Sequence, residues 1–285
     1  MIDRSHLRMG LDALARAHAM DYFADGHRGA AMVSAYFMCA EESVEEGVSE
    51  TIGAIVDRYW APTDLCAPLP DEVPDDSLLA GLIDAVAANV GDLRMVGHNV
   101  IFPSLALKAL REMPEAITPS RVAGIVKLVE AFDTPMDISI DDDDAFPDLG
   151  STESLAESVL REYVRSAEAF IGRGQGWTGH MLTVGRAVID LREAGHEDLA
   201  RTATGALKQY VKRARMGPLD TDKQYTEHGP MPQGPLTRAY WDKRRGHDPT
   251  LGHCIKYPYG FLGLMARAGD EALEQRCLDV AFRVL

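Results

Sequence analysis

A glycine–histidine pair occurs four times in the chain, and its spacing constrains the fold more than any other feature. Each pair opens a mostly apolar stretch, and the successive histidines are 71, 82 and 73 residues apart. Seven residues after each histidine stands a side chain of small or modest size. The near-regular spacing indicates four related units, each with room for one or two further helices. The histidines are His27, His98, His180 and His253, and the seventh residues are Ser34, Leu105, Ala187 and Gly260.

Apolar residues recur at helical spacing through nearly the whole chain, whereas alternating β-branched runs bounded by turn residues are hard to find. The pattern therefore predicts an all-α protein with eleven helices. Their expected ranges are 5–22, 27–42, 44–60, 75–90, 98–112, 118–132, 152–171, 180–194, 197–215, 253–268 and 271–284.

The four helices that begin with histidine are apolar nearly all round, while the helices between them carry charge on one face. A helix that is apolar on every side must be enclosed by other helices. An α/α barrel, or toroid, of alternating inner and outer helices satisfies this requirement. We therefore predict one barrel domain over residues 1–285, with the four imidazoles gathered at one mouth where the inner helices begin.

Two segments interrupt the helical pattern. Residues 133–150 form an acidic connection, and residues 216–252 form a long stretch rich in glycine and proline that also carries aromatic side chains. Long insertions in compact domains are commonly lids or binding loops. We expect residues 216–252 to cover the mouth of the barrel.

The repeated histidines suggest a metal site. Imidazole is a ligand for Fe, Cu, Zn and Mn, and it must be neutral to bind. The start of a helix disfavours the protonated ring, so the position suits this chemistry. A three-ligand site with one outlying histidine would leave a coordination position open. The alternative is that His27, His98, His180 and His253 are capping or packing residues that were duplicated with a helical hairpin.

Further polar residues are candidates for catalysis or substrate binding. His228 and His247 lie in the long insertion, each beside a carboxylate that could orient the ring. Polar side chains within apolar helices are costly unless paired, so they are candidates for the lining of a pocket. We predict His228, His247 and Tyr257 as catalytic groups, and Trp177, Arg186, Lys256, Asn99 and Tyr36 as substrate contacts.

The charge balance limits the partners. Twenty-nine basic against 44 acidic residues give a formal net charge of −15, which disfavours nucleic acid and anionic membranes. Basic residues cluster at 208–215 and 238–245, so a small anionic substrate is still compatible. The four cysteines form no CxxC pair, the amino terminus lacks a secretion signal, and no apolar run approaches the roughly 20 residues of a membrane span. We expect a cytoplasmic protein, with a homodimer possible through its apolar carboxy-terminal stretch.

Several short motifs resemble those of known families. The helix starts at Gly97-His98, Gly179-His180 and Gly252-His253 resemble those of lanthionine-cyclase-like and terpenoid-cyclase-like toroid enzymes. The lanthionine cyclase zinc site uses two cysteines and a histidine. In this chain only the pair His253-Cys254 resembles part of that ligand set. The string LGHCIKYPYG at 251–260 is similar to a helix start in questin-oxidase-like proteins, and Asp141 to Asp144 match the D-x-D-D pattern of class II terpenoid cyclases.

Three functions follow as hypotheses. The first is a small-molecule enzyme with a histidine-rich metal site, either an oxidoreductase or a hydrolytic enzyme or lyase. The second is a metal-free cyclase or isomerase that uses Asp141 to Asp144 or the loop histidines as acid. The third is a helical-repeat scaffold that binds a protein partner on a concave surface.

Overall fold

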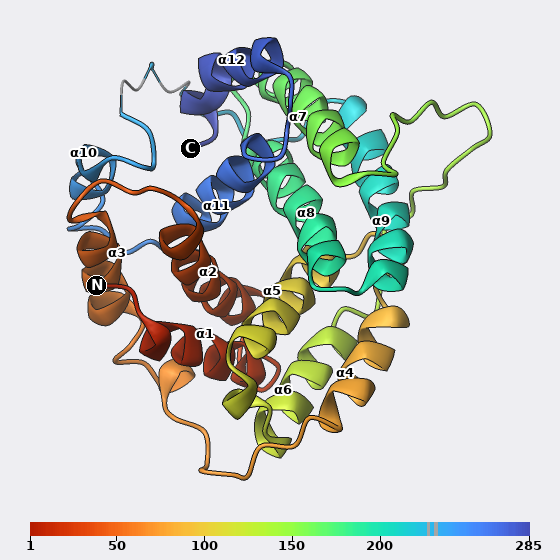
Figure 1. Ribbon diagram of the computed structural model, residues 1–285. Helices are drawn as coiled ribbons and strands as arrows, with labels where there is room; N and C mark the ends of the chain where they lie inside the picture. The colour runs from red at the N-terminus through yellow and green to blue at the C-terminus, as the bar shows by residue number, and fades with distance from the viewer. Residues whose placement is uncertain (227–228, 231–232) are drawn as a thin grey trace.

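The computed structural model describes residues 1–226, 229–230 and 233–285, and these residues form twelve α-helices and no β-strand (Figure 1). The prediction of an all-α protein is therefore confirmed. One isolated bridge joins Arg173 and Gln224. The helices are α1 (Arg4–Ala17), α2 (Tyr22–Glu41), α3 (Val48–Tyr59), α4 (Leu78–Ala87), α5 (His98–Glu112), α6 (Pro119–Glu130), α7 (Thr152–Ala169), α8 (Gly176–Glu193), α9 (Glu197–Arg215), α10 (Arg238–Asp242), α11 (His253–Met265) and α12 (Glu271–Val280).

Four helices form a closed ring at the centre of the molecule. Helix α2 contacts α5, α5 contacts α8, α8 contacts α11, and α11 returns to contact α2 (Figure 1). We call these four helices the central ring. Each ring helix is flanked in sequence by helices that pack outside the ring, so the ring takes every third helix of the described chain.

The apolar character of the ring helices follows from their enclosure. In α8 every residue from Thr178 to Leu191 is buried, whereas α9 buries one face and leaves most of its charged side chains exposed or half-exposed. The ring also depends on small residues for close packing. A Cβ atom on Gly260 of α11 would lie 2.9 Å from the backbone of Leu182 in α8, which is too close for a real contact.

Two of the four histidines do not begin a helix, contrary to the prediction. Helix α2 begins at Tyr22, because the side chain of Asp21 accepts a hydrogen bond from the backbone N–H of Ala24 and caps the helix five residues before His27. Helix α8 begins at Gly176 and also extends in front of its histidine. Only His98 and His253 are the first residues of their helices. The expected start at residue 44 is likewise wrong, since α3 begins at Val48.

The two interrupting segments differ from each other in the structure. Residues 133–150 contain no helix, and the carboxylates of Asp141 and Asp144 lie 2.8 Å and 2.7 Å from Nζ of Lys212 on α9. The 216–252 segment contains the short helix α10, which was not predicted and which packs against α3. No helix among the described residues is long and apolar enough to cross a membrane.

Candidate metal centre

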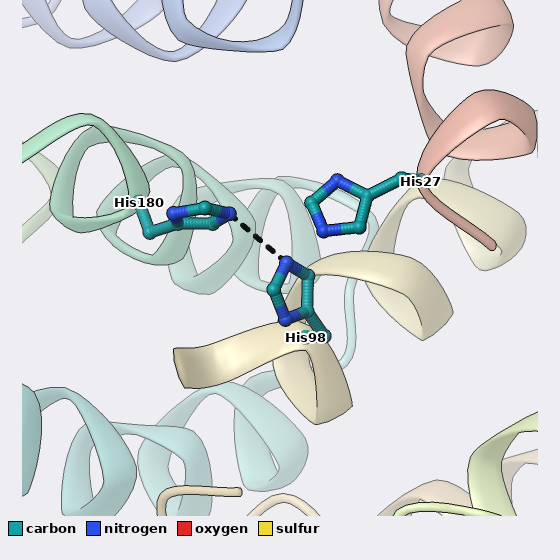
Figure 2. A group of neighbouring side chains, drawn as sticks. All are labelled: His27, His98 and His180. Atoms are coloured by element: carbon teal, nitrogen blue, oxygen red, sulfur yellow. Dashed lines mark hydrogen bonds between the residues drawn. The ribbon is translucent and has the colours of Figure 1, made fainter. Parts of the chain in front are cut away.

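The four histidines meet at one end of the central ring although they are far apart in the sequence. The ring centroid of His27 lies 4.2 Å from that of His98 and 4.9 Å from that of His253, and His180 lies 4.6 Å from His98 and 4.9 Å from His253. The imidazoles of His27, His98 and His180 point toward one another (Figure 2). These three buried side chains are close enough to hold one metal ion, with their nearest nitrogens all within 4.8 Å of one another.

Backbone carbonyls fix which nitrogen of two rings carries the proton. Nδ1 of His98 contacts the carbonyl oxygen of Met95, and Nδ1 of His180 lies 2.8 Å from the carbonyl oxygen of Gly176. Because a carbonyl oxygen can only accept, each Nδ1 must donate. In a neutral ring protonated on Nδ1, Nε2 carries a lone pair. The Nε2 atoms of His98 and His180 are only 3.0 Å apart, a contact drawn as the dashed line in Figure 2. With both rings protonated on Nδ1, two lone pairs face each other there.

Moving the proton of one ring from Nδ1 to Nε2 would relieve the repulsion between the two Nε2 atoms, but it would create a new repulsion at Nδ1. If His180 carried its proton on Nε2, it could donate to His98, but its Nδ1 lone pair would then face the oxygen of Gly176. The hydroxyl of Tyr257 lies 3.0 Å from the same Nδ1 and does not displace the carbonyl, which is closer. The arrangement therefore favours a cation placed between the two Nε2 atoms.

The other two histidines also present unpaired nitrogens. Nε2 of His27 and Nε2 of His253 are buried and have no hydrogen-bond partner among the described residues. Buried polar atoms without a partner are rare in native proteins and often indicate an ion or water. Two Nε2 atoms of the cluster thus have no hydrogen-bond partner among the described residues, and the other two face each other.

Burial keeps the rings neutral. Burial is the main cause and nearby Lys256 the second, and together they lower the pKa of His180 to about 3 and that of His253 to about 2. Burial also moves the pKa of His27 and of His98 well below the ordinary range. A metal does not have to compete with protons for such ligands near neutral pH.

Lys256 belongs to the same cluster. Its side chain is 1% exposed, and Nζ contacts Nδ1 of His27. Burial lowers the pKa of Lys256 well below that of an ordinary lysine. In its uncharged form this amine carries a lone pair and would not oppose a cation held by the imidazoles, as an ammonium group would.

A strained turn positions His98. Met95, Val96 and Gly97 all have positive φ, at 42°, 59° and 87°. This conformation is rare for a β-branched residue such as Val96, and strain of this kind concentrates at functional sites. The turn brings the carbonyl of Met95 to Nδ1 of His98 and thereby sets the proton position described above.

The glycine of each Gly-His pair is explained by the space beside it. A Cβ atom would overlap with Phe102 at Gly26, with Val184 at Gly97, with Tyr257 at Gly179 and with Ala31 at Gly252. Gly97 and Gly252 also have positive φ, at 87° and 67°, which glycine adopts without strain. The repeated motif thus reflects close packing around the imidazoles.

Two cavities reach the cluster, and His253 lines both. The larger, about 540 Å³, is bounded by the glycine-rich residues 171–176, by Tyr225 and by Tyr257. The ring of Tyr257 stacks on that of His253, with centroids 4.7 Å apart and planes at 9°. The smaller, about 230 Å³, is bounded by residues that include Trp241, His247 and Cys254.

Two of the three predicted catalytic residues, Tyr257 and His247, line the cavities that reach the cluster. Tyr257 lies between His180, His253 and the larger cavity. His247 is exposed and lines the smaller cavity. His228 lies outside the described residues. Catalysis by these residues remains a prediction.

The predicted substrate contacts are dispersed, and none of them is among the described residues that line these two cavities. Lys256 contacts His27, while Asn99 donates to the carbonyls of Asn89 and Asp92. The Arg186 guanidinium pairs with Asp190 and Glu41 at the other end of the ring. Trp177 accepts a hydrogen bond at its carbonyl from Tyr210, and Tyr36 donates to Glu112. Their contacts are thus made within the protein, and substrate binding by them remains a prediction.

Two groups of residues at the site escaped the sequence-based reasoning. The rings of Phe23 and Phe102 enclose the histidines, each about 5 Å from the centroid of His98. The wall at residues 171–176 has a sequence signal in its glycine-rich run, Gly172-Arg-Gly-Gln-Gly176. The partner of this wall, Tyr225, is brought to it by a backbone hydrogen bond to Gly172.

Comparisons of the chain with protein-family models, with curated proteins and with solved structures found no match.

Proposed function

We propose that this protein is a metal-dependent enzyme whose metal is bound by Nε2 atoms of His27, His98 and His180, with His253 beside them as a fourth donor. One observation carries the proposal. The Nε2 atoms of His98 and His180 lie 3.0 Å apart while both rings already donate from Nδ1 to backbone carbonyls. Two imidazole nitrogens can approach so closely when both bind one ion at the usual distance of about 2.1 Å.

The ligand set favours a transition metal. Imidazole suits Fe, Cu, Zn and Mn, whereas Mg and Ca prefer oxygen ligands. Neutral imidazoles leave the positive charge of the ion uncompensated, so such a metal would activate water or dioxygen, or polarise a carbonyl group. The identity of the metal decides between hydrolytic and oxidative chemistry.

The larger cavity supports a small-molecule substrate. Its volume of about 540 Å³ falls within the usual range for small-ligand sites, about 300 to 1,000 Å³. Ile171 and Tyr225 give it an apolar wall, and Arg173 and Arg283 bring positive charge to its lining. In a chain with a net charge of −15, this local charge supports a substrate with an anionic group. We assign Tyr257 to the contact between substrate and metal ligands.

We also propose that the central ring and the outer helices make a single α/α barrel. The closed order of contacts among α2, α5, α8 and α11 supports this architecture. The alternative acid site at Asp141 to Asp144 has less support, because Asp141 and Asp144 are paired with Lys212 and neither lines the cavities at His253. A scaffold role does not account for a cluster of imidazoles in which Nε2 of His27 and Nε2 of His253 are buried without a hydrogen-bond partner among the described residues.

Metal analysis of protein purified without a histidine tag tests the proposal. We expect close to one transition-metal ion per chain, lost in the double variant His98→Ala/His180→Ala. The matched control is His18→Ala/His196→Ala, which removes two histidines outside the cluster and should retain the metal. Equal metal content in the two double variants would overturn the proposal.

A further inference from the structure

A small enclosed cavity lies within the central ring, below the histidines. Its volume is about 10 Å³, and all four ring helices contribute to its wall. Three of the residues that stand seven positions after the repeated histidines line it, namely Ser34, Leu105 and Ala187. The small side chains of the repeat thus create a space inside the ring.

The polar groups of the wall differ in how well they are paired. The hydroxyl of Ser104 donates to the carbonyl of Ile101, that of Thr183 to the carbonyl of His180, and that of Tyr259 to the carboxylate of Asp190. Ser34 is fully buried, and its hydroxyl has no hydrogen-bond partner among the described residues. A buried hydroxyl without a partner destabilises a protein, so this one requires a partner from elsewhere.

We propose that the cavity binds a single water molecule, held by the hydroxyl of Ser34 together with the polar atoms of Thr183, Asp190 and Tyr259. A cavity of about 10 to 15 Å³ has room for one water, and such waters make two to four hydrogen bonds. The oxygens of Thr183 and Tyr259 and the carboxylate of Asp190 retain lone pairs that can accept from water. The cavity therefore has both the size and the donors and acceptors that a buried water needs.

This water joins two layers of the ring. Nζ of Lys108 lies 2.9 Å from Asp190 and 2.8 Å from the hydroxyl of Tyr259, and both Lys108 and Asp190 also line an outer pocket at the end of the ring opposite the histidines. The bound water extends that network inward to Ser34 on α2. It also reaches Thr183, whose hydroxyl is bonded to the backbone of His180. The site does not depend on a metal at the histidines.

Whether Ser34→Ala lowers or raises the stability of the folded protein tests the proposal. If water pairs with Ser34, Ser34→Ala removes a hydrogen bond, and the folding equilibrium constant in urea titrations should fall about three- to tenfold. If no water is present, the same change removes an unpaired hydroxyl, and the constant should stay the same or rise. Ser104→Ala is the matched control, because the protein itself pairs that hydroxyl, and its folding constant should fall in either case.

A second measurement detects the water directly. Magnetic relaxation dispersion of water oxygen-17 counts the long-lived internal waters of the folded protein. We expect Ser34→Val, which fills the cavity, to have one such water fewer than the wild type at the same metal content. An unchanged number of long-lived waters would overturn the proposal. Because the cavity is separate from the histidines, the result does not depend on whether the protein binds a metal.

Discussion

At the scale of single residues, burial decides the chemistry of the imidazoles. His180 is buried and His253 is partly buried, so their pKa values fall to about 3 and about 2. The proton of His180 is placed on Nδ1 by the carbonyl of Gly176, and that of His98 by the carbonyl of Met95. The result is a group of imidazole nitrogens whose hydrogen-bonding needs the described residues do not meet.

The lowered pKa values predict how the stability of the metal-free protein depends on pH. Unfolded histidine titrates near 6.5, whereas folded His180 titrates near 3. Between these values the unfolded chain binds more protons, so stability is lost as the pH falls below about 6.5. Each such histidine contributes a slope of up to about 1.4 kcal/mol per pH unit.

Urea unfolding of chelator-treated protein at pH 5 to 8 measures this slope. The variant His180→Gln lacks one titrating group and should have a shallower dependence than the wild type between pH 5 and 6. Identical slopes would show that His180 is not held neutral by burial.

At the scale of helices and turns, the connection before α5 sets the position of His98. Gly97 combines a φ of +87° with close packing against Val184. Gly195 has the same φ of +87°, but a Cβ atom there would meet nothing within 4 Å. Replacing Gly195 with alanine therefore tests the backbone conformation alone, whereas replacing Gly97 tests the same conformation together with steric crowding.

We expect Gly195→Ala to lower the free energy of unfolding by about 1 kcal/mol, the cost of a left-handed conformation. Gly97→Ala should cost about 1 to 3 kcal/mol more, because overpacking adds to that strain, and it should reduce metal binding by displacing His98. Chemical denaturation and metal titration of both variants provide the comparison. Equal losses of stability would refute the packing role of Gly97.

At the scale of the whole molecule, the ring is held at the end opposite the histidines by a network of charges centred on the buried Arg186 and Asp190. Arg186 of α8 pairs with Glu41 of α2 and with Asp190, and Lys108 of α5 pairs with the same two carboxylates. Tyr259 of α11 donates to Asp190. All four ring helices thus meet in one network, which fixes their relative positions.

Breaking this network should be costly. Asp190→Asn removes the charge that faces Arg186 and Lys108 and leaves Glu41 as their one remaining carboxylate in the network. Removing one partner of a buried ion pair costs about 3 to 5 kcal/mol. By contrast, Asp198→Asn alters the pair of Asp198 with Arg201, whose side chains are 89% and 76% exposed, and should leave the denaturation midpoint unchanged. A similar midpoint for both variants would exclude the network as the main constraint on the ring.

The sequence predicted the all-helical fold and the approach of His27, His98 and His180, because both follow from a periodic pattern that repeats along the chain. It did not predict that α2 begins at Tyr22, since the cap by Asp21 outweighs the glycine before His27. Nor did it predict the wall formed by residues 171–176 and Tyr225, which depends on backbone contacts between distant segments. Local patterns determine helices, whereas cavities depend on how those helices and their connections pack.

The central claim is that imidazole Nε2 atoms of the cluster bind one metal ion. X-ray absorption spectroscopy at the edge of the metal that copurifies with the untagged protein tests this most directly. We predict at least three imidazole nitrogens around the ion at about 2.0 to 2.2 Å. A bound metal surrounded only by oxygen or sulfur, or a fully folded protein that takes up no transition metal, would contradict the claim.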